Sequence, residues 1–176
     1  MCIRDRDKEA YSSFEDKEKE ELDQLRRITV DFVQPGEQQP EIEHNFKAQH
    51  SYSGYLNIVQ RGWRDCRGEG FFSYEMSVDP QVQMYLVVTY FGGDRTFYID
   101  GIRYERDFQI SVDGHVIAEQ KLEANQPYED TFEVRYELPL SLTTGKTKIE
   151  IMFLAAEGKV AGGVYGVRIT NSKECF

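Results

Sequence analysis

The chain has 176 residues, of which 40% are hydrophobic and 13% aromatic, a composition that supports a packed core over most of its length. Its 21 Lys and Arg against 31 Asp and Glu give a formal net charge of −10, which argues against a nucleic-acid partner because that affinity comes mainly from clustered cations. No apolar run approaches the roughly 20 residues of a membrane-spanning helix, and three cysteines are too few for a disulfide scaffold.

Residues 1–6 read Met-Cys-Ile-Arg-Asp-Arg, a hexapeptide similar to the translated adapter remnant at the head of truncated metagenomic reading frames. We therefore expect a sequencing artefact over residues 1–6, in which case Cys2 does not belong to the natural protein. The alternative is an ordinary disordered N-terminus.

Residues 7–27 predict a charged connector helix. Ser12 or Ser13, each with an acidic residue three positions later, matches a capping box, and good helix formers follow. Apolar positions such as Phe14 and Leu22 are few and form only a thin stripe. A solvated connector is therefore expected, and a partner-binding helix is the alternative.

Residues 28–45 predict a Pro/Gly linker strap laid over the surface of the domain. Thr29–Val33 reads as a short extended piece. The stretch from Pro35 to Pro40 disfavours both helix and sheet interior, because proline lacks a backbone donor and pushes the preceding residue into an extended conformation.

Residues 46–173 alternate hydrophobic with polar side chains, the period of strands with one buried face. Met84–Phe91 is almost continuously apolar and predicts a central strand covered on both sides. Asp113 and Gly114 predict a two-residue hairpin turn. Because short strands recur with no convincing helix between them, the sequence predicts an all-β domain, an antiparallel β-sandwich or jelly roll of the galactose-binding-like kind.

No catalytic or metal-binding constellation emerges from the residues. Cys66 lies between two arginines that could favour a thiolate, but no motif ties a histidine to it, so we expect a structural thiol. The cysteines and histidines lack the spacing of a zinc site, and no cofactor is expected. No carboxylate pair can be named for glycoside hydrolysis. Loop acids leave a structural calcium open: Asp65, Glu69, Asp113 and Asp130.

Sugar recognition remains, because sugars bind where apolar aromatic faces meet a few polar groups. The candidate carbohydrate-binding residues are Trp63, Arg64, Asp65 and Tyr165. The alternative is a packing role, with a lone Trp as an anchor of the sandwich and Arg64–Asp65 as a local ion pair.

Five motifs in order resemble the C-terminal region of glycoside hydrolase family 127-type proteins, the β-L-arabinofuranosidase-like group. Each motif is weak alone, but the five in this order are fairly specific, and the resemblance extends over residues 28–171. They are ITVDFVQPGEQQPEIEHNF (28–46), GWRDCRGEGFFSYEMSV (62–78), YLVVTYFGGD (85–94), FQISVDGHVIAEQKL (108–122) and AGGVYGVRI (161–169).

The resemblance implies a multidomain enzyme in which an α/α-barrel carries catalysis, with a cysteine nucleophile, a zinc site and a glutamate acid/base. No position of this sequence matches that constellation, so no catalytic residue carries over and the chain alone is not expected to be an enzyme. The resemblance thus implies a non-catalytic C-terminal module that supports or completes a missing catalytic barrel of the same polypeptide. It also favours a periplasmic or extracellular location.

This first hypothesis predicts an exposed apolar patch of the kind that marks interfaces, with contributions from Phe14, Leu22, Phe32 and Val33. The alternative is an autonomous carbohydrate-binding module that recognises plant-type glycans through exposed aromatic rings. Neither hypothesis involves a nucleic acid or a membrane.

Overall fold

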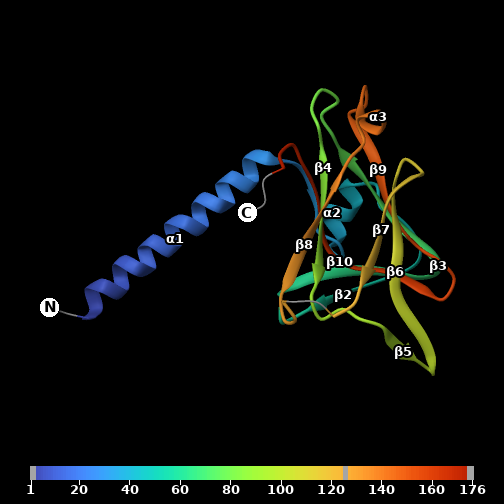
Figure 1. Ribbon diagram of the computed structural model, residues 1–176, viewed down its shortest axis with the longest axis horizontal. Coiled ribbons are helices and arrows are strands. Elements are labelled where there is room, and N and C mark those ends of the chain that lie inside the picture. Colours follow the sequence, from blue (N-terminus) through green and yellow to red (C-terminus); the bar gives the residue numbers. More distant parts are fainter. Residues whose placement is uncertain (1–2, 125–126, 174–176) are drawn as a thin grey trace.

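A computed structural model describes residues 3–124 and 127–173 of the chain, with side chains from residue 14 onward. The described part is mostly β-structure, preceded by one long helix (Figure 1). In chain order the elements are α1 (Ile3–Ile28), β1 (Thr29–Val33), α2 (Gln38–Glu43), β2 (Lys47–Leu56), β3 (Arg61–Ser77), β4 (Tyr85–Phe91), β5 (Phe97–Ile99), β6 (Ile102–Val112), β7 (His115–Leu122), β8 (Thr131–Glu137), α3 (Leu140–Thr143), β9 (Lys148–Ala155) and β10 (Lys159–Thr170).

The strands form a sandwich whose two layers are connected by long, bent strands (Figure 1). The first part of β3 pairs with β10 and its second part, Phe71–Ser77, pairs with β9. Between them Gly68 and Glu69 have positive φ angles of 47° and 57°, a backbone bulge that bends the strand. Pairing is antiparallel apart from a short parallel contact of β10 with β6. The predicted antiparallel β-sandwich is confirmed.

The core lies between the layers and follows the predicted alternation. On β3 the side chains of Phe72, Tyr74 and Met76 are fully buried. The ring of Phe72 stacks on that of Phe153 from β9, with 4.8 Å between centroids. Strand β4 is buried along nearly its whole length and pairs with β10 on one side and β8 on the other, which confirms the prediction of a central strand.

Residues 28–45 are not the linker strap that the sequence predicted. Strand β1 pairs with β10, and Val33 at its end is fully buried in the core. Helix α2 forms despite Pro40, its third residue. Proline is tolerated there because the N–H groups of the first helical turn have no acceptor within the helix, so the donor missing from Pro40 costs nothing.

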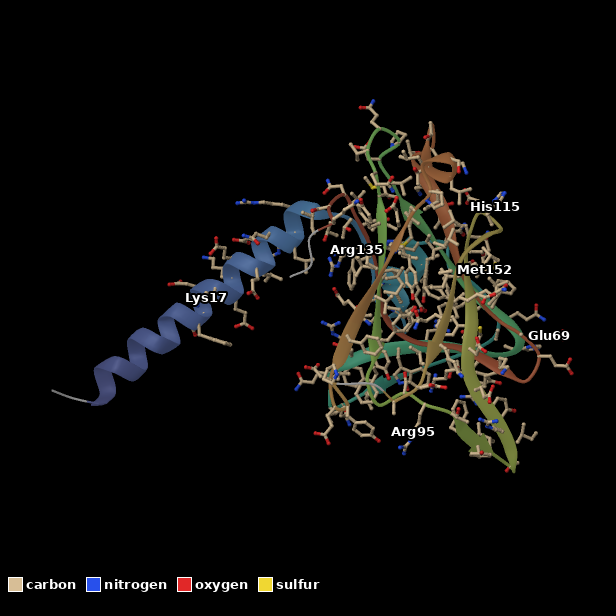
Figure 2. The ribbon with its side chains drawn as sticks, viewed as in Figure 1. Lys17, Glu69, Arg95, His115, Arg135 and Met152 are labelled. Carbon is tan, nitrogen blue, oxygen red and sulfur yellow. The ribbon has the colours of Figure 1, made fainter. Side chains whose placement is uncertain are left out.

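Helix α1 extends away from the sandwich, as the position of Lys17 shows (Figure 2). It begins at Ile3, well before the predicted caps at Ser12 and Ser13, and ends at Ile28. Phe14 and Leu22 are exposed, as is Phe32 on β1, whereas Val33 cannot belong to the predicted apolar patch because it is buried. The artefact predicted for residues 1–6 stays a prediction, and Met1 and Cys2 lie outside the described residues.

The β6–β7 hairpin confirms the predicted turn, with φ angles of 46° at Asp113 and 81° at Gly114. Gly114→Ala is expected to lower the free energy of unfolding by about 1 kcal/mol, because an L-residue is strained in the left-handed region. No atom lies within 4 Å of the added Cβ, so the loss is attributable to the backbone. Urea denaturation measures it. Gly114→Asn is the control and should lose less, since asparagine tolerates this conformation; equal losses would contradict the explanation.

Candidate functional site

Strand β3 sends two of the predicted sugar-binding residues to opposite faces. Arg64 and Asp65 are consecutive, and successive side chains of a strand alternate between faces. Both are buried, with 8% of Arg64 and 1% of Asp65 exposed. No Arg64–Asp65 ion pair forms; instead Arg64 binds Glu41, and Asp65 faces Arg67 and Arg106. The two residues therefore belong to two separate sites.

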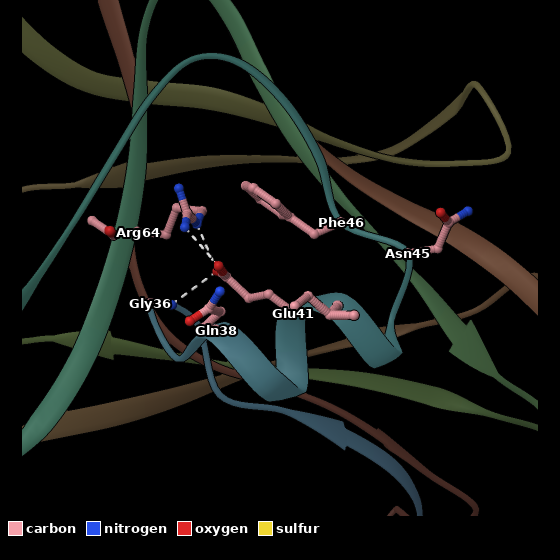
Figure 3. Close-up of a pocket in the computed structure, with 8 residues that line it drawn as sticks. Gly36, Gln38, Glu41, Asn45, Phe46 and Arg64 are labelled. Atoms are coloured by element: carbon pink, nitrogen blue, oxygen red, sulfur yellow. Dashed lines mark hydrogen bonds and ion pairs between the residues drawn. The ribbon is translucent and has the colours of Figure 1, made fainter.

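Arg64 lies at a pocket of about 550 Å³ between helix α2 and strands β2 and β3 (Figure 3). The wall contains one aromatic ring, one aliphatic side chain, a guanidinium, a carboxylate and two side-chain amides. The lining residues are Gly36, Gln38, Glu41, Ile42, Asn45, Phe46, Ser53 and Arg64.

The carboxylate of Glu41 is the centre of the pocket floor. Arg64 donates to it twice, from Nε at 2.6 Å and from Nη2 at 2.7 Å. The backbone N–H of Gly36 and the hydroxyl of Tyr74 each donate to it at 2.9 Å. Burial, reinforced by the charge of Glu41, raises the pKa of Tyr74 well above its usual value. This buried pair is short, bidentate and fully hydrogen-bonded, so it is a rigid structural element.

The guanidinium of Arg64 is held from two more directions. Its Nη1 donates to Ser51 Oγ at 3.0 Å, and its Cζ lies 4.1 Å from the ring centroid of Phe46. Burial alone would lower the pKa of Arg64. The hydrogen bonds to Glu41 raise that pKa, and its net shift is upward. Arg64 is therefore permanently charged and immobile, while Gln38, Asn45 and Ser53 remain exposed at the rim of the pocket.

Asp65 belongs to a second group, here called the Asp–Arg cluster: Asp65 and Arg67 of β3, Asp94 after β4, and Arg106 of β6. Arg67 Nη2 lies 3.5 Å and Arg106 Nη1 4.0 Å from Asp65 Oδ2, and Arg106 Nη2 lies 3.3 Å from Asp94 Oδ1. Burial raises the pKa of Asp94 to about 6 and also raises that of Asp65, against the opposing charges of the arginines.

Of the other two predicted residues, Tyr165 lies near this cluster, whereas Trp63 packs against strand β2. Tyr165 packs on Phe91 with 5.9 Å between ring centroids, and burial together with the charge of Asp94 raises its pKa. Trp63 is half-buried opposite Gly54, where an added Cβ would come within 2.7 Å of the indole. Asp65 and Tyr165 are thus brought together, whereas Arg64 is not part of their group.

Sequence reasoning missed Glu41, Phe46, Asp94 and Arg106. None stands in a motif that signals a site, because each reaches its partners across the fold. Glu41 is 23 residues from Arg64. The only local signal is the pair of glycines before Asp94, which marks a turn at the end of a buried strand.

Cys66 is a buried thiol that donates to the backbone oxygen of Phe153 at 3.8 Å. Burial, with the nearby charge of Asp65, raises its pKa to about 12, the opposite of what an activated nucleophile requires. Among the side chains that the structure describes, from residue 14 onward, no three His, Cys, Asp or Glu residues come together in a way that could hold a metal ion. None of the described helices is long and apolar enough to cross a membrane.

The model of a family of unknown function (DUF6805) matches residues 24–170. No curated protein matches the chain. Among solved structures it is similar to a family 35 carbohydrate-binding module from Clostridium thermocellum, at 12% identity and TM-score 0.51, covering 81% of this chain and 99% of that one. The ANX1 ectodomain from Arabidopsis thaliana gives 12% identity and TM-score 0.52 over 82% of this chain and 42% of that one.

An exo-β-1,3-galactanase from Phanerochaete chrysosporium, solved with β-1,3-galactotriose, is similar at 14% identity and TM-score 0.50 over 71% of this chain. This chain spans only 27% of the length of that enzyme. At such identities these likenesses show the β-sandwich fold and no more. None of the comparisons links the chain to glycoside hydrolase family 127.

Proposed function

Because this chain belongs to a family of unknown function (DUF6805), we propose its role from its own fold and pocket: a non-catalytic, carbohydrate-binding β-sandwich module. The observation that carries the proposal is the pocket beside Arg64, an open hollow of about 550 Å³ with a rigid polar floor and an aromatic wall. The sandwich fold, shared with the family 35 carbohydrate-binding modules, supports it.

The pocket has the parts that a sugar ring requires. Ile42 and Phe46 offer apolar surface to the C–H face of the ring, while Gln38, Asn45 and Ser53 offer donors and acceptors to its hydroxyls. The Glu41–Arg64 pair fixes part of the wall, because Gly36 donates to the carboxylate of Glu41 and the guanidinium of Arg64 lies over the ring of Phe46. A preformed wall costs little ordering on binding, which favours affinity.

Calorimetric titration of the full chain with arabinan, arabinogalactan and β-1,3-galactotriose tests the proposal. We expect at least one to bind, and Asn45→Ala to raise its Kd about 2- to 10-fold by removing one hydrogen-bonding side chain from the pocket. Asn57→Ala is the matched control, since Asn57 is also exposed but does not line the pocket. Absence of binding to all three glycans, or equal losses in the two variants, would overturn the proposal.

A finer proposal concerns the setting of the module: the C-terminal part of a β-L-arabinofuranosidase-like enzyme, where it supports or completes the catalytic barrel. The sequence resemblance motivates it, and the exposed Phe14 and Leu22 on a helix that leaves the sandwich support it, since that helix can meet a neighbouring domain (Figure 1). For the organisation of the chain we propose an artefact over residues 1–6, then a connector helix, then a sandwich domain that includes residues 29–45.

The genomic sequence upstream of codon seven tests this setting. A reading frame that continues into a helical barrel is the expected result, and a stop codon just upstream would refute it. The chain alone should release no sugar from arabinofuranosides; release by the purified chain would contradict its non-catalytic role.

A further inference from the structure

Tyr55 is an exposed aromatic residue on the face of β2 that borders the pocket. Ser53, which belongs to the pocket wall, lies opposite Arg64 in the pairing of β2 with β3. Tyr55, two residues farther along, lies opposite Gly62. Alternate residues of a strand point to one face, and residues directly opposite each other in an antiparallel pair share a face. The side chain of Tyr55 therefore continues the face of Ser53 and Arg64, about 7 Å farther along the strand.

The turn formed by Pro35 and Gly36 adjoins both the pocket and the surface beside Tyr55. Gly36 is part of the pocket lining. A Cβ placed on Gly62, the residue opposite Tyr55, would lie only 2.7 Å from the backbone oxygen of Pro35. The turn thus packs on β3 at the position where Gly62 contributes no side chain. The pocket and the ring of Tyr55 therefore lie on the same side of the sheet, next to the same turn.

The ring of Tyr55 has no stacking partner among the described side chains. Tyr55 is 61% exposed, and none of the ring–ring or cation–ring contacts of those side chains involves it. Tyr52, on the opposite face of the strand, has its ring centroid 4.5 Å from Cζ of Arg67. Packing thus explains the ring of Tyr52 but not that of Tyr55. An uncovered tyrosine offers a ligand a large, rigid apolar surface with a polar hydroxyl at its end.

The residues around Tyr55 on β2 define the chemistry of that ligand. Residues 51–60 contain no Asp, Glu, Lys, Arg or His, although 30% of the whole chain is charged. A ligand held along this segment therefore gains nothing from a charge of its own. A neutral sugar ring has an apolar C–H face that packs on an aromatic ring, and its hydroxyls bond to hydroxyl side chains such as that of Ser53.

We propose that Tyr55 binds a second sugar unit beside the one in the pocket, so that the ligand is a neutral oligosaccharide and not a free monosaccharide. This inference rests on the proposed function, because the pocket holds the first unit. In this arrangement the first unit packs on Ile42 and Phe46, and the unit linked to it covers the ring of Tyr55. The second contact adds affinity because the linked unit is already held near the ring.

NMR titrations of the full chain test the proposal by comparing the Kd of a sugar with that of its own dimer. The pairs are D-galactose with β-1,3-galactobiose and L-arabinose with α-1,5-arabinobiose. We expect the disaccharide of at least one pair to bind about 3- to 10-fold more tightly than its monosaccharide, the gain from one aromatic contact. Tyr55→Ala should remove this gain and leave the Kd of the monosaccharide unchanged. Tyr55→Phe keeps the ring and should retain most of the gain.

The controls separate the second sugar position from the pocket. Tyr98→Ala is the matched variant, since Tyr98 is 67% exposed on β5, which supplies no residue to the pocket, and it should leave every Kd unchanged. Asn45→Ala should weaken monosaccharide and disaccharide alike.

Equal Kd values within both pairs, a Tyr55→Ala variant that keeps the gain, or an equal loss in Tyr98→Ala would refute the second sugar position. The pocket proposal survives each of these results if Asn45→Ala still weakens binding. Absence of binding to all four sugars would also refute the second position, and the titrations with arabinan, arabinogalactan and β-1,3-galactotriose then decide the pocket proposal separately.

Discussion

Replacing Glu41 with alanine is expected to lower the free energy of unfolding by about 3–5 kcal/mol, the range for breaking a buried ion pair by removing one partner. The variant leaves Arg64 charged with only 8% of its surface exposed, and it deprives Gly36 and Tyr74 of their acceptor. Chemical denaturation followed by tryptophan fluorescence measures the loss, since Trp63 is the single tryptophan and adjoins Arg64.

Glu43→Ala is the matched control on the same helix. Glu43 is exposed and accepts one hydrogen bond, from Gln39, so its loss should change stability by less than about 0.5 kcal/mol. Glu41→Met combined with Arg64→Leu should recover much of the lost stability, because no unpaired charge then remains. Equal effects at positions 41 and 43 would show that the pair does not organise the pocket.

Replacing Asp94 with asparagine is expected to raise the free energy of unfolding relative to that of the unmodified chain, by an amount that grows as pH rises from below 4 to above 6. The pKa of Asp94 is 3.8 in the unfolded chain and about 6 in the folded one, because burial disfavours its charged form. The folded state therefore holds the proton more tightly, and the unmodified chain loses stability through this interval. Asparagine does not titrate, so the variant should gain about 3 kcal/mol relative to the unmodified chain.

Unfolding free energies of both chains at pH 3 and pH 7 measure this change. Glu75→Gln provides a control of opposite sign, because the hydrogen bond from Lys148 lowers the pKa of Glu75. The stabilisation from Glu75 is present above its unfolded pKa and is lost as pH falls through the folded value. The unfolding free energy of Glu75→Gln, relative to that of the unmodified chain, should therefore be lower at pH 7 than at acidic pH. A pH-independent difference between Asp94→Asn and the unmodified chain would mean that Asp94 is not buried as a charge.

The β-sandwich could be predicted from the sequence because each strand has a local pattern of hydrophobic residues. The alternation around Phe72 and Tyr74 predicts which side chains face the core, and the apolar run of β4 predicts a strand covered on both sides. The prediction was wrong at residues 28–45, where the local rules for proline and glycine predict a linker and the structure forms a strand and a helix. Proline reads as a helix breaker unless it falls in the first turn, and the sequence does not say where α2 begins.

The candidate site could be predicted only in part, since residues that are neighbours in sequence need not be neighbours in function. Trp63, Arg64 and Asp65 read as one polar-aromatic group, but the period of the strand sends Arg64 to the pocket and Asp65 to the Asp–Arg cluster. Trp63 packs against Gly54 instead.

By itself, the sequence determined the period of burial, the positions of most strands and turns, and the choice of an all-β domain, since these depend on residues within a few positions of each other. Only the tertiary structure decided that Glu41 meets Arg64 and that Asp94 and Arg106 meet Asp65. Those contacts join segments far apart in the chain, and only the stacking and bending of the layers brings them together.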